Sequence, residues 1–444
     1  MNPLPGFAGI LTGMFAIGVM QLILATALPF IVAEIGGGDL YSWVFSSYLL
    51  ASLATIPLFS KLADIYGKRK FYLLGMGIFG VGSLYGGLAP SMPHLIAARV
   101  VQGLGAGIIT PVALAMITDM FPAEKRGSMI GIFGFVQLSA ILLSPPLGSF
   151  ITRNAGWFWI FFLNIGLVGI SSFLVLLGSR HQESTSSMKP VEIDIAGGLM
   201  FGAFCALTVG FANVLGKQGS GDSSGLWFLP VISMTALLLV IIESRHRNPV
   251  IKIEFLKTRI IRSSIISSIL AGAIMYGLVT ILPLCGMILS KQGFQLDESK
   301  ILLFFMIGIT IGLLASSRLA DRFRSGTYPR LLWGIMSASA LLMVYSLGNR
   351  NLMLFNLLNA LIGIGTGGVM ATFLINSQNA ISSQDRTTLS GLIQLGRYFG
   401  GSLGVTLLTD MLPEVTLISG IGQFHGAFGV LVALCAAGLM NEIL

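Results

Sequence analysis

Residues 60–64 read Ser-Lys-Leu-Ala-Asp, and residues 317–321 read Ser-Arg-Leu-Ala-Asp. The second copy follows the first at an offset of 257 residues (317 minus 60). Each copy comes directly after a long apolar stretch. A repeat with so long a period indicates that a whole set of helices is duplicated, rather than one short motif.

Two further pairs of segments support the duplication. The glycine-rich segment 103–107 has a counterpart at 363–367, and segment 145–148 (Pro-Pro-Leu-Gly) has one at 401–404 (Gly-Ser-Leu-Gly). Both pairs lie inside apolar stretches, in the fourth and fifth stretch of each set. The order of the repeated features is therefore the same in both halves of the chain.

The composition excludes a soluble protein. Only 10% of the 444 residues are charged, whereas about 25% is usual for soluble domains. Hydrophobic residues make up 54%, and the mean hydropathy is +0.87. A soluble protein of this size cannot bury so much apolar surface, so the sequence predicts a chain that crosses a membrane many times.

A membrane-spanning helix needs about 20 apolar residues. Fourteen stretches meet this need: 7–33, 41–60, 71–90, 94–118, 127–151, 157–179, 194–215, 226–243, 263–288, 299–317, 329–348, 352–376, 387–409 and 424–441. Two repeated sets of six helices in the same orientation are typical of one transporter architecture. The predicted fold is thus all-α, with a six-helix half at 1–180, an inserted two-helix hairpin at 181–262 and a second six-helix half at 263–444.

Basic residues orient the chain. The loops on the side of the two termini hold 19 Lys and Arg, and the opposite loops hold 5. Because cytoplasmic loops are enriched in positive charge, both termini are predicted to be cytoplasmic, in a multi-pass protein of the cell membrane. The net charge of +8 is then a signal of orientation and does not indicate a nucleic-acid partner.

Three stretches resemble motifs of the major facilitator superfamily. Residues 61–70 (KLADIYGKRK) are similar to its loop signature between helices two and three, and residues 99–106 (RVVQGLGA) to its fourth-helix motif. Residues 144–149 (SPPLGS) resemble its fifth-helix antiporter motif in degenerate form. With fourteen spans, the resemblance points to the drug:proton antiporter branch, which implies efflux of hydrophobic or amphipathic small molecules by proton antiport and alternating access.

The resemblance implies a conformational gate formed by Asp64, Gly67, Lys68 and Arg69, in which the acid pairs with the other half of the protein. Asp321 is the second copy of that acid. Taken alone, a basic run beside a helix end also fits anionic lipid headgroups and membrane topology. That simpler interpretation does not explain why the acidic residue Asp64 lies beside the basic run.

Two arginines lie inside predicted helices, where a charge is costly and suggests a function. The resemblance places Arg99, with Gln102, in a core that couples proton and substrate sites. Arg397 lies near the middle of its predicted helix, and its partner cannot be named from sequence. Snorkelling towards the headgroups is the structural alternative for either residue. The Pro145-Pro146 pair, with Gly148, predicts a bend in the fifth helix, whether for packing or for transport.

The sequence departs from the fourteen-span branch at Met20, where relatives commonly carry Asp. No Asp or Glu lies deep in a predicted helix. Proton coupling is therefore expected to use an acid near a helix end, for which Asp119 is the candidate, or another group altogether. The polar residues predicted to line a substrate cavity are Gln21, Gln137, Asn356, Asn359 and Gln394. The predicted core thus has two positive charges, Arg99 and Arg397, and no acidic residue deep in a helix. This favours a neutral or anionic amphipathic substrate over a dication.

No catalytic constellation, metal site or cofactor site is predicted. The segment Gly363–Gly368 matches a dinucleotide-binding pattern by letter, but it lies in an apolar helix without a preceding strand. The chain is therefore predicted to be a non-enzymatic, monomeric transporter whose partners are a small hydrophobic substrate, protons and the lipid bilayer. The alternatives are a carrier of one specific lipid, siderophore or metabolite, and a membrane scaffold that transports nothing.

Overall fold

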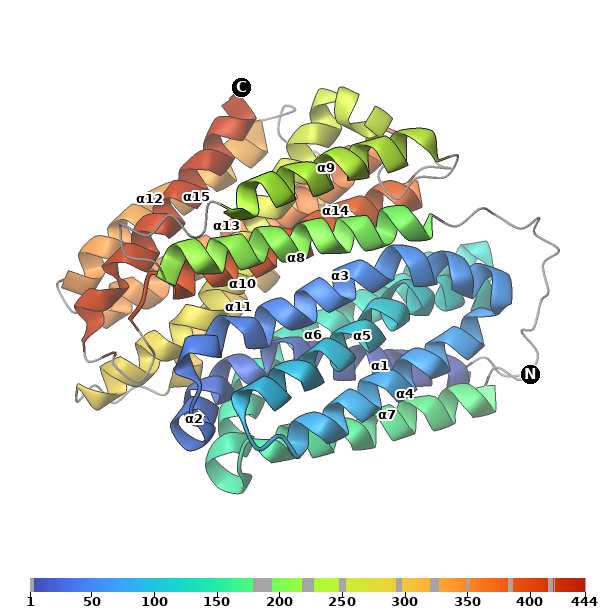
Figure 1. Cartoon of the computed structure of the whole chain (residues 1–444), viewed down its shortest axis with the longest axis horizontal. Coiled ribbons are helices and arrows are strands. Elements are labelled where there is room, and N and C mark those ends of the chain that lie inside the picture. Colours follow the sequence, from blue (N-terminus) through green and yellow to red (C-terminus); the bar gives the residue numbers. More distant parts are fainter. Residues whose placement is uncertain are drawn as a thin grey trace. The chain divides into compact units, whose positions relative to one another are not determined.

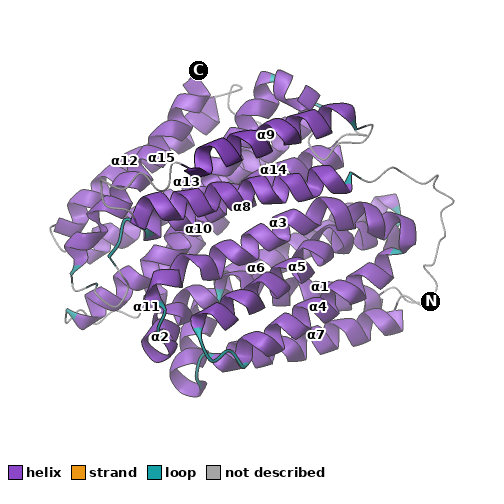
Figure 2. Cartoon of the chain, in the orientation of Figure 1, coloured by secondary structure: helices purple, strands orange, loops and turns teal. Residues whose placement is uncertain are grey.

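The computed structural model describes residues 4–178, 194–217, 227–246, 253–292, 298–319, 327–348, 351–381, 386–413, 418 and 420–443. All regular structure in these segments is helical, as Figure 2 shows. The all-α prediction is therefore confirmed for the described part of the chain.

The first seven α-helices follow the first six predicted spans. They are α1 (Leu4–Leu22), α2 (Leu24–Ile35), α3 (Tyr41–Tyr66), α4 (Lys68–Gly87), α5 (Met92–Met120), α6 (Ala123–Ala155) and α7 (Phe158–Gly178). The predicted span 7–33 is divided at Ile23 into α1 and α2. Periodicity did not predict this break, because both pieces are apolar throughout.

The remaining helices follow the other predicted spans. They are α8 (Ile195–Lys217), α9 (Phe228–Arg245), α10 (Arg259–Lys291), α11 (Glu298–Leu319), α12 (Thr327–Gly348), α13 (Leu352–Asn379), α14 (Arg386–Thr409) and α15 (His425–Ile443). Short 3-10 helices precede α3, α10 and α15, namely η1 (Gly38–Leu40), η3 (Ile253–Lys257) and η6 (Ile421–Phe424).

Eleven helices of the described residues are long and apolar enough to cross a membrane. Helices α4, α12 and α14 are not among them, because each combines basic side chains with many small or hydroxylic residues. The chain is thus a multi-pass membrane protein, while the count of fourteen spans stays a prediction.

The chain divides into two compact units. The first comprises residues 1–40, 47–203 and 245–250, and the second comprises residues 41–46, 204–244 and 251–444. The division falls within α8 and also within α3, whose residues 41–46 belong to the second unit.

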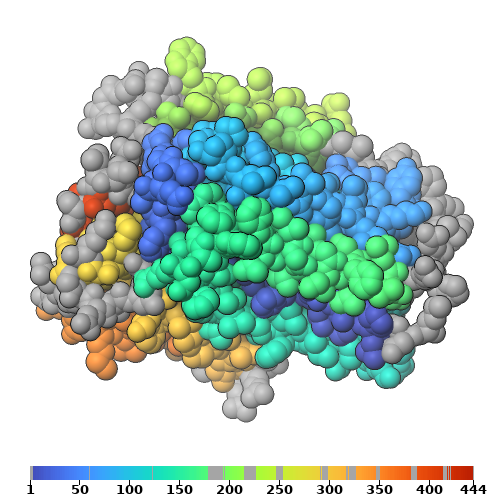
Figure 3. Space-filling view, turned by 90° about the horizontal axis from the view of Figure 1, so that it is seen from below, coloured from blue at the N-terminus to red at the C-terminus, as the bar shows by residue number. Residues whose placement is uncertain are grey.

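In the first unit, α4 packs along α5 and α7, and α1 packs along α6 and α7. Figure 1 shows α4 and α7 as neighbouring rods in the lower part of the view. Large apolar side chains cover the outer face of α7, which is drawn in green in Figure 3: Trp159, Leu163, Ile170, Phe173, Leu176 and Leu177. Exposed apolar side chains along a whole helix suit contact with lipid chains.

In the second unit, helices pair through small residues. Helix α10 packs along α14, and α11 packs along α13. A Cβ added at Gly400 or Gly404 would collide with the backbone of α10, at Ile269 or Ala273 respectively. Glycine is therefore required for these helices to approach so closely, as in many membrane helix pairs.

The glycines that match between the halves also pack alike. Gly103 and Gly107 of α5 lie against the carbonyl oxygens of Tyr48 and Ser52 in α3. In the second unit, Gly363 and Gly367 of α13 lie in the same way against the carbonyl oxygens of Phe305 and Ile309 in α11. Both pairs of contact residues are separated by 257 positions, the same offset as the opening repeat (305 minus 48, 309 minus 52).

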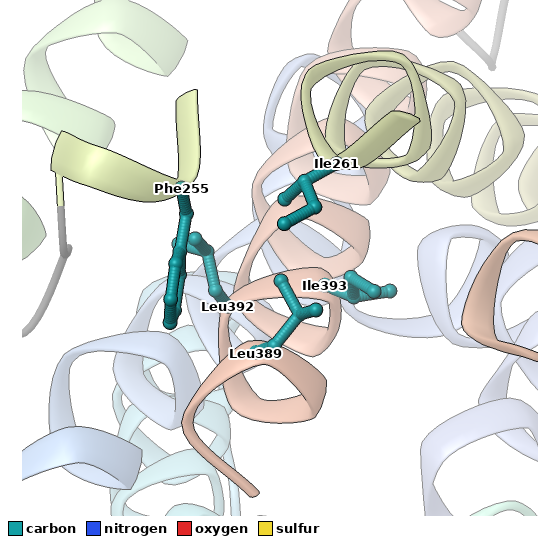
Figure 4. Packing of buried hydrophobic residues seen from close by; sticks show 5 residues of the cluster. All are labelled: Phe255, Ile261, Leu389, Leu392 and Ile393. Atoms are coloured by element: carbon teal, nitrogen blue, oxygen red, sulfur yellow. The ribbon is translucent and has the colours of Figure 1, made fainter. Parts of the chain in front are cut away.

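A small apolar cluster fixes the segment that precedes α10. Phe255 of η3 and Ile261 of α10 pack with Leu389, Leu392 and Ile393 of α14, as Figure 4 shows. This contact holds the first turn of α10 against α14, and that turn carries Arg259 and Arg262.

Candidate functional site

The loop signature forms a tight turn between α3 and α4. Gly67 has φ +106°, a conformation that L side chains rarely adopt, and its N–H donates to the carbonyl of Ala63 at 3.0 Å. Helix α4 begins at the next residue, so Gly67 is the residue that allows one helix to follow the other directly.

Lys68 joins three helix ends of the first unit. Its Nζ lies 2.6 Å from Oδ2 of Asp119, at the end of α5, and 3.4 Å from Oδ1 of Asp64, at the end of α3. The side chains of Asp64 and Asp119 are about half exposed, at 53% and 51%. Pairs of this kind contribute about 0.2–1 kcal/mol, which suits contacts that form and break repeatedly.

Arg69 connects α4 to the end of α7. Its Nη2 donates to the carbonyl oxygen of Leu176 at 3.0 Å. The second unit contains an equivalent contact, in which Nε of Arg330 in α12 donates to the carbonyl oxygen of Glu442 in α15 at 3.0 Å. A cation at a helix C-terminus is favourable because the last carbonyls carry partial negative charge. The predicted counterpart of Asp64, Asp321, lies outside the described residues.

Arg99 is fully buried in the first unit. Its Nη1 donates to Oε1 of Gln102 at 2.7 Å, and its guanidinium lies 4.1 Å from the centroid of the Tyr48 ring. A guanidinium over an aromatic face is a cation–π contact that strengthens when it is desolvated. Because the side chain is held inside the protein, it does not snorkel.

Gln102 extends the arginine contact into a buried network. Its Nε2 donates to Oγ of Ser83 at 3.0 Å, and Nδ2 of Asn164 donates to the same oxygen at 2.8 Å. The network joins α4, α5 and α7. Sequence reasoning identified Arg99 and Gln102 but missed Ser83 and Asn164. The signal that could have revealed Asn164 was its own polar side chain within the apolar run of residues 160–168.

Arg397 lies half-buried in α14 of the second unit. Its Nη2 donates to Oε1 of Gln394, one turn earlier, and its guanidinium lies 5.7 Å from the centroid of the Tyr398 ring. Arg99 and Gln102 have the same spacing of three residues. Both arginines of the predicted core thus donate to an amide oxygen on their own helix.

The two prolines lie inside α6, which continues from Ala123 to Ala155. Oγ1 of Thr26 in α2 lies 3.4 Å from the carbonyl oxygen of Pro145, and a Cβ at Gly148 would lie 2.6 Å from the carbonyl oxygen of Ile23. Segment 144–149 therefore packs closely against the break between α1 and α2.

The predicted cavity residues fall in both units. In the first, Gln137 of α6 lies against Gly18 of α1, one turn before Gln21. In the second, α13 carries Asn356 and Asn359. Asn359 is fully buried, and neither polar atom of its side chain has a hydrogen-bond partner among the described residues.

Acidic side chains lie at helix ends in the described residues. Asp194, just before α8, and Glu243, near the end of α9, are both 3% exposed. Oδ1 of Asp194 accepts from the N–H of Gly197 at 2.7 Å, while its buried Oδ2 has no hydrogen-bond partner in the described part of the chain. Sequence reasoning missed that these terminal acids are buried. Met20, where relatives commonly carry Asp, is 1% exposed.

No group of three or more His, Cys, Asp or Glu in the described segments is arranged to hold a metal ion. The three cysteines, Cys205, Cys285 and Cys435, are free thiols buried among apolar residues.

Comparison with known proteins identifies the family. The Major Facilitator Superfamily profile matches residues 10–405. Multidrug resistance protein 3 of Bacillus subtilis (strain 168) is 30% identical over 92% of this chain and 79% of its own length. Multidrug transporter protein MdtP of the same organism is 28% identical over 90% of this chain and 73% of its own length.

A solved structure supports the same fold. The chain resembles a bacterial homolog of the human lysosomal transporter Spinster, crystallised in an inward-facing and occupied conformation. The TM-score is 0.60 at 16% identity, over 98% of this chain and 95% of the other. The chain belongs to the major facilitator superfamily. It is a secondary transporter of small molecules in a membrane, and not an enzyme.

Proposed function

We propose that this transporter exports hydrophobic or amphipathic small molecules by proton antiport and alternating access. The observation that carries the proposal is the similarity, over nine tenths of the chain, to two proteins named for multidrug resistance or transport. The proline-containing segment 144–149, packed against α2, agrees with the resemblance to the antiporter motif.

The proposal includes the topology. Helices α4, α12 and α14 complete fourteen spans, arranged as two six-helix halves (1–180 and 263–444) and a hairpin within 181–262. Both termini face the cytoplasm, and the protein acts as a monomer in the plasma membrane. The excess of Lys and Arg in the loops on that side supports this orientation.

The cluster of Asp64, Lys68 and Asp119, with Gly67 and Arg69, is the proposed cytoplasmic gate. Its contacts are solvent-exposed ion pairs, so they are weak enough to break in each transport cycle. Asp321 takes part as the repeated acid. Asp119 has a second role in the proposal, since it links the gate to α5, which also carries Arg99.

The core of the proposed mechanism contains Arg99, Gln102 and Arg397. The residues proposed to contact the substrate are Gln21, Gln137, Asn356, Asn359 and Gln394. Because the cationic side chains of this core donate to amides on their own helices, the core favours a neutral or anionic amphipathic substrate. A lipophilic dication would be repelled.

Transport by purified protein in proteoliposomes tests the function. A pH gradient is imposed, and a lipophilic dication, a neutral amphiphile and an acidic drug are compared. We expect gradient-dependent movement of the neutral or acidic compound. Strong export of the dication alone would refute the substrate class, and transport insensitive to the gradient would refute proton antiport. Transport of one narrow class of lipid, siderophore or metabolite would replace multidrug efflux, and no transport at all would favour a scaffold.

A further inference from the structure

A cavity of about 690 Å³ opens within the second unit, where four helix ends meet. Its walls come from the first turns of α10 and α12 and the last turns of α13 and α15. All four ends belong to the side that carries the excess of basic loop residues, the predicted cytoplasmic side. Among the described residues, none of the proposed gate or core residues lines this cavity.

Three arginines give the cavity its charge. Arg259 and Arg262 come from α10, and Arg330 comes from α12. In the described part of the chain, no carboxylate lies within 4.0 Å of these guanidiniums. All three residues are exposed, so their charged groups are available to a ligand.

The one acidic residue among the described lining residues, Glu442, accepts hydrogen bonds from neutral donors. Oε1 of Glu442 accepts from Oγ of Ser263 at 2.6 Å and from Nδ2 of Asn441 at 3.4 Å. Arg259 and Arg330 still interact with its charge at longer range. Among the described lining residues, three cations against one carboxylate leave a formal excess of two positive charges.

We propose that this cavity binds a phosphate group. The planar guanidinium of an arginine can donate two parallel hydrogen bonds to two oxygens of one phosphate. The amides of Asn376 and Asn379 supply further donors in the same wall. A bare phosphate is small for a cavity in the usual size range of organic ligands. Ile260, Pro329 and Phe373 give it an apolar side, so the ligand is a phosphate that carries an organic substituent.

Binding is measured on the full chain in detergent, through the rise of its unfolding temperature as ligand is added. The probes are dioctanoyl phosphatidic acid, inorganic phosphate at matched ionic strength, and dioctanoylglycerol, which has the same chains without the phosphate. We expect phosphatidic acid to stabilise the protein and dioctanoylglycerol to have no comparable effect. Stabilisation by phosphatidic acid alone identifies a lipid headgroup as the ligand. Equal binding of inorganic phosphate identifies a soluble phosphate compound.

The variants Arg259→Gln and Arg262→Gln test the site. Neither residue has a hydrogen bond or ion pair that the fold depends on among the described contacts, so both variants should fold. Each should weaken the apparent Kd for the phosphate probe about tenfold or more, since a charged hydrogen bond is lost. Arg245→Gln is the matched control, because Arg245 is exposed on the same predicted side and does not line the cavity.

Two results would overturn the proposal. One is the absence of stabilisation by either phosphate probe, or equal stabilisation by dioctanoylglycerol. The other is unchanged affinity in both cavity variants, or an equal loss in Arg245→Gln, which would mean that the general positive charge of this side attracts the probe. The test measures binding and not transport, so it stands apart from the proposed efflux function.

Discussion

Nζ of Lys68 lies 2.6 Å from Oδ2 of Asp119, and this contact joins the start of α4 to the end of α5. The same ammonium group reaches Asp64 at the end of α3. One cation is therefore shared by two acids that are 55 positions apart in the sequence (119 minus 64). A helix turn at Gly67 brings the cation into range of both.

Substitution of Asp64 tests the gate. We expect Asp64→Asn to lower transport several-fold and to leave membrane insertion normal. The free energy of unfolding should change by less than about 1 kcal/mol, because the lost ion pair is half exposed. Glu124→Gln, which removes an exposed acid at the nearby start of α6, is the control and should transport normally. Unchanged turnover in Asp64→Asn would remove this acid from the mechanism.

The buried network around Arg99 predicts a loss of stability. Gln102→Met removes the acceptor of Arg99 and the donor to Ser83. Loss of a hydrogen-bond acceptor by a buried charged group costs about 1–3 kcal/mol or more, so thermal unfolding in detergent should occur at a clearly lower temperature. Val100→Met is the control, since Val100 is exposed on the same helix. Equal unfolding temperatures for both variants would contradict the network's structural role.

The ring of Tyr48 allows a separate test. Tyr48→Phe keeps an aromatic face beneath Arg99, whereas Tyr48→Leu removes it. The leucine variant should be less stable than the phenylalanine variant by about 0.5–2 kcal/mol, the range of a cation–π contact. If the two variants unfold at the same temperature, the contact between the guanidinium and the ring contributes nothing to stability.

Arg397 is expected to determine transport. Arg397→Ala should abolish transport or change the order of preferred substrates, while Arg397→Lys keeps the charge and should retain part of the activity. Initial rates for several substrates in proteoliposomes give the measurement. Wild-type kinetics for every substrate in the alanine variant would make Arg397 a structural residue.

The close helix pairs predict which glycines resist substitution. A Cβ at Gly367 would collide with the carbonyl of Ile309, whereas a Cβ at Gly334 would meet open space. Gly367→Ala should destabilise the protein by about 1–3 kcal/mol, and Gly334→Ala should be neutral or stabilising. Expression level and unfolding temperature compare the two. Equal behaviour would show that α11 and α13 can separate at no cost.

The sequence predicted the helices well because apolar length alone defines a membrane span. It also predicted Gly67 and the glycine segments, since turns and close helix contacts require a particular residue type. The contact partners of these side chains were harder to predict. Nothing local in the sequence pairs Lys68 with Asp119 or brings Asn164 to Ser83, because those contacts depend on how separate helices pack. The division at Ile23 was missed for a related reason: its neighbours on both sides are equally apolar.

The glycine contacts of α10 with α14 and of α11 with α13 have a mechanical consequence. Backbones that touch along several turns cannot slide past each other without steric collision, so each helix pair should move as one rigid body. Conformational change within the second unit would then concentrate between the two pairs, where larger side chains repack. A mutation that loosens the packing within a pair should therefore slow transport, because the two helices no longer move together, even when every residue that contacts the substrate is intact.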